Sequence, residues 1–150
     1  MKVFLVDARN ELKRAEHILY VSLKYTRTVD VLRNLLERLI TCLDITIRSA
    51  LRTAKEKKLI DDIPENQGDR CEELRKVMAD EKTTEMLQFY MALRKISRAE
   101  YTKSREFRRH VTMTAQTDEG PVDINLDISK EYFEKSVSYV EHIEQKLEEL

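Results

Sequence analysis

The sequence predicts a mainly α-helical protein, an up-and-down bundle of four or five helices with a small β-hairpin near its C terminus. Gly and Pro each occur only twice among 150 residues, and 37% of the residues are charged. This composition is typical of helices and not of turn-rich sheets. Apolar residues also recur at steps of three and four along most of the chain, and only one late stretch alternates with a period of two. At this length we expect a single domain over residues 1–150.

The first predicted helix extends to about Tyr25. The residues of its expected inner face follow steps of three and four, which places them on one helical face; they are Leu5, Ala8, Leu12, Ala15, Leu19 and Ser22. Residues 25–28 supply hydroxyl groups for a turn and for the N-cap of the next helix.

The second predicted helix is the longest, because its apolar stripe continues over roughly 30 residues, or about 45 Å. The stripe comprises Val29, Leu32, Leu36, Leu39, Leu43, Ile47, Ala50 and Ala54. Further apolar side chains widen it, namely Leu35, Ile40, Cys42 and Ile45. A helix with so wide an apolar surface needs partners on two sides. Either two helices of this chain cover it, or one side meets a second subunit and the protein is a homodimer.

Residues 58–68 are expected to form a loop that Asp69 closes, with Glu72 three residues later in an acidic variant of the capping box. A third helical region starts there and is expected to break near residues 80–84. Its stripe then resumes with Met86, Phe89, Tyr90, Leu93 and Ile96. Ser129 is the expected cap of the last helix, whose inner face carries Phe133, Val137, Val140, Ile143, Leu147 and Leu150.

The β-hairpin is predicted over about residues 110–128, where the apolar period changes to two. The alternating apolar residues are Val111, Met113, Ala115, Val122, Ile124, Leu126 and Ile128, on both sides of a turn at residues 118–121. An isolated hairpin is marginally stable in water, so its apolar face is expected to rest on the helices.

Residues 94–110 hold the strongest local excess of charge, with seven Lys and Arg residues against Glu100 and Glu106. Such a segment attracts a phosphate backbone, and the interleaved Tyr101 and Phe107 could stack on unpaired bases. The alternative is a solvated helix end whose cations favour the helix dipole and pair with acidic neighbours. On the first interpretation the nucleic-acid-binding residues are Arg98, Tyr101, Lys103, Phe107, Arg108 and Arg109.

Within this segment, Arg105 is followed after four residues by His110. An arginine can hold a phosphate with its bidentate fork, and a histidine can exchange a proton with a ribose hydroxyl or a leaving oxygen at neutral pH. The pair therefore suits RNA cleavage without a metal ion.

A small helical bundle with a long second helix and a late Arg-x4-His motif resembles the HEPN superfamily. The resemblance implies a dimer in which Arg105 and His110 of the two subunits face one another and cleave RNA without a metal. It also implies an alternative role as the partner of an antitoxin-like protein. The residue after the arginine is Glu106, where that family often has Asn, Asp or His. Glu106 would place a negative charge beside the phosphate.

We expect no metal, no cofactor and no membrane span. Cys42 and Cys71 stand 29 residues apart without CxxC spacing, so both are expected to be buried thiols. The acidic side chains of residues 123–127 imitate a calcium loop but alternate as the solvent face of a strand. No stretch approaches 18 uncharged apolar residues, and a cytoplasmic location is expected. The competing functional hypothesis is a non-catalytic dimeric scaffold or protein-interaction module that uses the apolar surface from Leu35 to Ile47.

Overall fold

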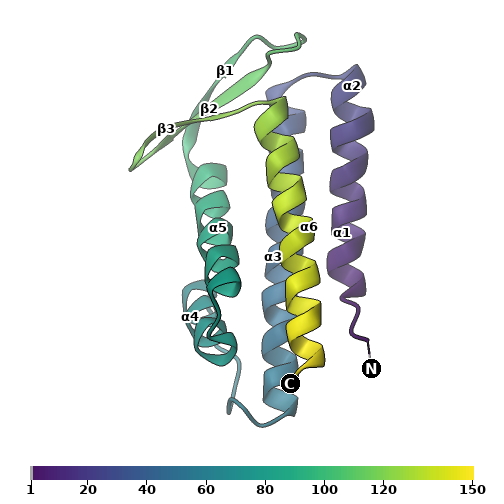
Figure 1. Cartoon of the computed structure of the whole chain (residues 1–150). Coiled ribbons are helices and arrows are strands. Elements are labelled where there is room, and N and C mark those ends of the chain that lie inside the picture. The colour runs from purple at the N-terminus through teal and green to yellow at the C-terminus, as the bar shows by residue number, and fades with distance from the viewer. Residues whose placement is uncertain (1) are drawn as a thin grey trace.

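The computed structural model describes residues 2–150 and is mainly helical, with a small three-stranded antiparallel sheet (Figure 1). Its elements in chain order are α1 (Val6–His17), η1 (Ile18–Ser22), α2 (Leu23–Tyr25), α3 (Val29–Glu56), α4 (Gln67–Met78), α5 (Glu81–Arg98), β1 (Glu100–Ser104), β2 (Thr112–Thr117), β3 (Gly120–Ile124) and α6 (Leu126–Glu148). The sheet lies across one end of the helices, and both chain termini lie at the other end (Figure 1). Among the described residues, no helix is both long and apolar enough to cross a membrane.

The first predicted helix is confirmed up to Tyr25, but its inner face differs from the prediction. The helix includes a π-helical stretch, η1, between α1 and α2. A π-helical turn contains an extra residue, so it shifts the inner face along the chain. As a result Ile18 and Leu23 are buried, five residues apart, whereas the predicted Leu19 and Ser22 are only partly buried.

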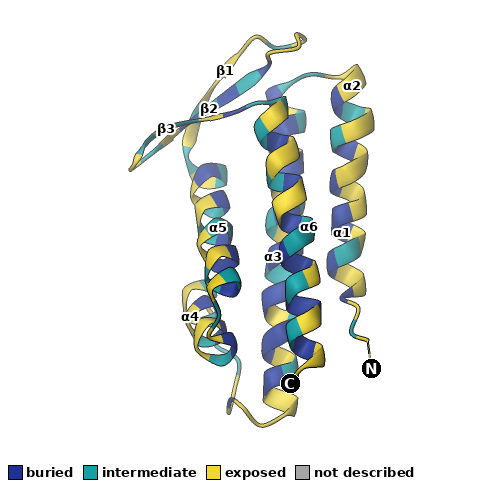
Figure 2. Cartoon of the chain, in the orientation of Figure 1, coloured by how far each residue is buried: buried dark blue, intermediate teal, exposed yellow. Residues whose placement is uncertain are grey.

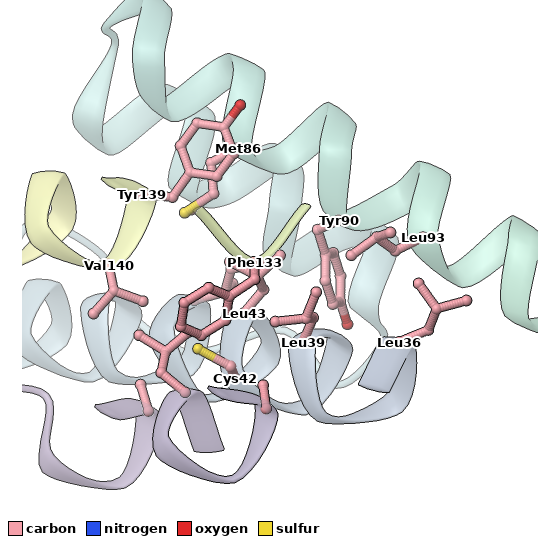
Figure 3. Close-up of a cluster of buried hydrophobic side chains, with 14 of the residues drawn as sticks. Leu36, Leu39, Cys42, Leu43, Met86, Tyr90, Leu93, Phe133, Tyr139 and Val140 are labelled. Atoms are coloured by element: carbon pink, nitrogen blue, oxygen red, sulfur yellow. The ribbon is translucent and has the colours of Figure 1, made fainter. Parts of the chain in front are cut away.

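Helix α3 is the central element, and its predicted stripe is buried in full from Val29 to Ala54. It contacts all four of the other long helices, α1, α4, α5 and α6. The inward faces of these helices are buried and their outward faces exposed (Figure 2). Leu39, Cys42 and Leu43 meet side chains from α5 and α6, such as Tyr90 and Phe133 (Figure 3). Helices of the same chain therefore cover the wide apolar surface.

Three helix starts show which polar side chains act as caps. The predicted break near residue 80 is confirmed: Asp80 accepts a hydrogen bond from the Thr83 N–H at 3.0 Å and starts α5. The caps predicted for α4 and α6 are wrong. Asn66, not Asp69, caps α4, and Asn125, not Ser129, caps α6 with 2.9 Å between its Oδ1 and the Ile128 nitrogen. Asn and Asp accept the orphan N–H groups of a first turn equally well, so tertiary packing decides between neighbouring candidates.

The predicted hairpin is confirmed as β2 and β3, but the sheet has one more strand. In the strand order β1-β2-β3, Met113 pairs with Ile124 across one ladder and with Lys103 across the other. The turn uses Gly120 at φ +113°, which a residue with a Cβ rarely adopts. The buried side of β2 rests on α5 and α3, as its apolar alternation predicts. The hairpin ends at Ile124, since Leu126 and Ile128 already belong to α6.

A buried carboxylate joins the start of the chain to its last helix. Glu144 of α6 accepts hydrogen bonds from the Leu5 N–H at 2.8 Å and from Arg9 Nε at 2.7 Å. Burial alone would raise the pKa of Glu144, but the bonds from Arg9 and Leu5 outweigh that cost and hold its pKa below the ordinary value. The ionised form of this carboxylate therefore fastens α1 to α6.

Candidate functional site

The basic segment runs from the end of α5 through a strand into a loop, so the alternative interpretation as a solvated helix end holds only for its first residues. Arg94, Lys95 and Arg98 lie at the C-terminal end of α5, where Lys95 Nζ lies 3.7 Å from Glu119 Oε1. Helix α5 ends at Arg98, β1 follows at once, and residues 105–111 form the loop between β1 and β2. We call residues 105–111 the basic loop. It lies at the same end of the molecule as the turn between α2 and α3 and the start of α6 (Figure 1).

The basic loop has a defined conformation with two left-handed residues. Arg105 has φ +53° and Phe107 has φ +64°, each at a cost of about 1–2 kcal/mol for a residue with a side chain. Bonds within the loop run from the Arg108 N–H to the Arg105 carbonyl at 3.2 Å and from the Val111 N–H to the Arg108 carbonyl at 3.1 Å. Val111 is fully buried and anchors the end of the loop. Such strained residues persist only where the surroundings hold them.

Those surroundings are the first turn of α3 and the residues just before it. The Phe107 N–H donates to the Arg27 carbonyl at 2.6 Å. The Glu106 carboxylate accepts from the Val29 N–H at 3.0 Å, while Thr28 caps Val31. The start of a helix carries partial positive charge, which favours a carboxylate there. Glu106 therefore connects the loop to α3, whereas its sequence position predicted a negative charge beside a phosphate.

Arg105 and His110 line one pocket, together with Arg109. The pocket has a volume of about 260 Å³, and its other walls are Thr112, the N-cap residue Asn125, and Leu126 and Asp127 in the first turn of α6. Arg105 and Arg109 form no ion pair with any residue from 2 to 150. Two free guanidinium groups, one imidazole and one carboxylate therefore share a space open to solvent. An anion with hydrogen-bond acceptors, such as a phosphate, matches the two guanidinium groups and the imidazole of this set.

The other predicted nucleic-acid contacts divide into two groups. Tyr101 and Lys103 are engaged within the fold: the Arg33 guanidinium lies 4.3 Å from the Tyr101 ring centroid, and Lys103 Nζ lies 3.2 Å from Asp30 Oδ1. The bond to Asp30 raises the pKa of Lys103. These contacts fasten β1 to α3.

The second group is open to solvent. Arg98, Arg108 and Arg109 are exposed, and Phe107 keeps 77% of its surface accessible. Of these, only Arg109 lines the pocket of Arg105 and His110. Phe107 lies between the pocket residues Arg105 and Arg109 in the chain, and its ring is exposed to solvent. An unpaired base could stack on this ring.

Sequence patterns missed the α6 side of this pocket. Asn125 and Asp127 follow Arg105 by some 20 residues and join it only because the hairpin returns the chain to the same end. Asn125 could have been recognised as a helix N-cap, because Asn is a favoured cap residue and accepts the N–H of the residue three positions later, here Ile128. No local signal connects Asp127 to the basic loop.

The remaining reactive groups lie away from this end. Cys42 and Cys71 are buried free thiols, as predicted, and burial raises the pKa of each, that of Cys42 to about 12. Both are therefore protonated and poor nucleophiles. No group of three or more His, Cys, Asp or Glu side chains within residues 2–150 is placed to hold a metal ion.

Comparison with known proteins gives no match to this chain among family models, curated proteins or solved structures. The resemblance to the HEPN superfamily therefore stays a prediction, and the functional argument rests on the site itself.

Proposed function

We propose that this protein binds RNA, or another phosphate-bearing partner, through the basic loop and the pocket beside it. The observation that carries the proposal is that Arg105, Arg109 and His110 line one pocket and that neither arginine forms an ion pair within residues 2–150. The loop that holds them is fastened by Glu106 and Phe107 to the start of α3. The cations are thereby placed before a ligand arrives, which lowers the entropy lost on binding.

We further propose that the bound RNA is cleaved without a metal ion. Arg105 would hold the scissile phosphate with its guanidinium fork. His110 would take the proton of the adjacent ribose 2′-hydroxyl, whose oxygen attacks the phosphorus as the bond to the 5′-oxygen breaks. The products are a 2′,3′-cyclic phosphate and a strand whose 5′-oxygen takes a proton from water. This is the activity that the HEPN resemblance implies.

Binding is tested by fluorescence anisotropy of a labelled single-stranded RNA over a range of salt concentrations. We expect Arg105→Ala with Arg109→Ala to weaken binding at least tenfold and to reduce the salt slope by roughly 0.7 for each lost phosphate contact. The matched control is Arg52→Ala with Lys57→Ala, which also removes two positive charges. Both side chains are exposed, form no ion pair within residues 2–150 and lie at the C-terminal end of α3, whereas the loop contacts its N-terminal end. Equal affinities for the loop variant and the control would contradict the binding proposal.

Cleavage is tested separately, with purified protein, the same RNA and EDTA. His110→Ala should abolish formation of the cyclic phosphate while RNA affinity stays within about threefold of the wild type. If the wild type binds RNA but leaves it intact, the enzymatic part of the proposal is removed and the binding part stands.

A second candidate function is a protein-interaction module, which a groove between α1 and α6 favours. Phe4 and Val6 are exposed over 60% and 62% of their surfaces. They line a pocket of about 460 Å³ together with Phe133 and Val137 of α6. An apolar groove of this kind suits a protein partner or a second copy of the chain. The dimer proposed from the HEPN resemblance would use this face or the basic loop, because the surface from Leu35 to Ile47 is already covered.

Solution mass separates these alternatives. A dimer that Val6→Glu dissociates without loss of RNA binding assigns the groove to self-association. A monomer with salt-sensitive RNA binding leaves the groove for a foreign protein.

A further inference from the structure

A second pocket adjoins the first at the start of α6. It has a volume of about 260 Å³ and lies between the end of the first helix and α6, with Leu19, Tyr20, Leu23, Lys24, Arg27 and Lys130 among its lining residues. Leu126 and Asp127 line both pockets. The two spaces are therefore neighbours on opposite sides of the α6 N-terminus.

Hydrogen bonds also join the basic loop to the residues around this second pocket. The Phe107 N–H donates to the Arg27 carbonyl, and Arg27 Nε in turn donates to the Leu23 carbonyl at 3.2 Å. This chain of bonds holds the turn between α2 and α3 against the loop. A ligand in the first pocket would have the second pocket's cations beside it without a rearrangement of the backbone.

Charge continues across both pockets. Their permanent cations are Lys24, Arg27, Arg105, Arg109 and Lys130, and none forms an ion pair within residues 2–150. The one carboxylate is Asp127, in the first turn of α6 between the two groups. The negative charge of Asp127 is stabilised there, because the N-terminal end of a helix carries partial positive charge. It repels a phosphate from the helix end itself and leaves room for one on either side.

Aromatic side chains accompany these cations. Tyr20 lines the second pocket with 51% of its surface exposed, and its ring meets Phe133 edge-on at 6.5 Å between centroids. Tyr25 is 77% exposed, with Lys24 Nζ 5.9 Å from its ring centroid. Phe107 is equally exposed on the loop. Contact with Phe133 restrains the Tyr20 ring while leaving part of it open, which suits stacking on a base.

We infer that a single RNA strand crosses the start of α6 and occupies both pockets, with the second pocket as a subsite for the nucleotide next to the one held by the basic loop. This inference rests on the proposed function. Lys24, Arg27 and Lys130 hold the flanking phosphate, and Tyr20 stacks on its base. A paired base in a duplex does not offer its face for stacking, so the subsite selects single-stranded RNA.

Anisotropy with oligouridylates of two to ten nucleotides tests the subsite. For the wild type, affinity should rise with length until the strand spans both pockets. Lys24→Ala with Lys130→Ala should bind the shortest oligomers like the wild type but the long ones at least fivefold more weakly. The matched control is Lys57→Ala with Lys76→Ala, which removes the same charge at two exposed lysines that form no ion pair within the described part of the chain, residues 2–150. Tyr20→Leu keeps an apolar contact with Phe133 and should also weaken only the longer oligomers.

The outcomes separate the subsite from the proposed function. If the Lys24 and Lys130 variant matches its control while the Arg105 and Arg109 variant loses affinity, the subsite is refuted and the basic loop stands. If the lysine variant weakens short and long oligomers equally, the lysines act only through their general field and the subsite is refuted as well. If the wild type binds no oligomer, both proposals fail. A thermal melt of each variant confirms that it is folded.

Discussion

Glu106 offers the sharpest test of how the basic loop is held. Its carboxylate accepts the Val29 N–H at 3.0 Å, at the first residue of α3. A hydrogen bond to a charged group contributes about 1.5–3 kcal/mol when well buried. Glu106 is only partly buried, so we expect Glu106→Ala to lower the free energy of unfolding by about 1–2 kcal/mol.

Glu106→Gln should cost less, because the amide oxygen can still accept the Val29 N–H. Only the favourable interaction of the charge with the helix dipole is lost, which corresponds to about 0.3–1 kcal/mol. Urea denaturation followed by far-UV circular dichroism measures both values. The matched control is Glu73→Gln, since Glu73 is also partly buried but forms no side-chain hydrogen bond or ion pair within residues 2–150.

RNA affinity provides a second measurement on the same variants. If Glu106 stood beside the bound phosphate, its neutralisation would remove a repulsion and tighten binding. In the structure it faces α3, so its loss loosens Arg105 and Phe107, and we expect affinity to stay equal or fall. Unchanged stability together with tighter RNA binding would refute this account of Glu106.

Two further predictions concern stability. Because the pKa of Glu144 is lowered in the folded protein, its contribution is complete above the unfolded value of about 4.3 and is lost as the pH falls through the folded pKa. Urea denaturation between pH 3 and 7 should therefore show a smaller acid loss for Glu144→Gln, and an unchanged pH profile would contradict this. Ala79 ends α4 at φ +50°, so Ala79→Gly should raise the free energy of unfolding by about 0.5–1 kcal/mol. In the same assay the control Ala92→Gly, inside α5, should lower it by about 1 kcal/mol, and a destabilised Ala79→Gly would be inconsistent with left-handed strain.

The strand β1 has no sequence pattern that predicts it. Its residues are exposed except for the partly buried Tyr101, so no apolar alternation marks it. It forms because β2 offers an edge for pairing, and Lys103 and Tyr101 then reach Asp30 and Arg33. Such a strand depends on its partners and not on its own pattern.

Composition alone marks the basic segment, residues 94–110, and the chemistry of arginine and histidine marks Arg105 and His110 within it. The sequence could not show that both line one pocket within a single chain, that Glu106 turns towards α3, or that Lys24 and Lys130 lie nearby. Each of these depends on contacts between residues far apart in the chain.

The sequence by itself determined the helices, because a side chain every three or four residues must be apolar for a helix to bury one face, and it determined the β2–β3 hairpin by the period of two. Tertiary structure alone decided where the first helix shifts its face at η1, which polar residue caps α6 and what covers α3. Local periodicity shows which residues are buried, because a helix or a strand must be apolar on its buried face. Neighbouring caps, bulges and packing partners differ in free energy by only about 1 kcal/mol, so tertiary packing decides among them.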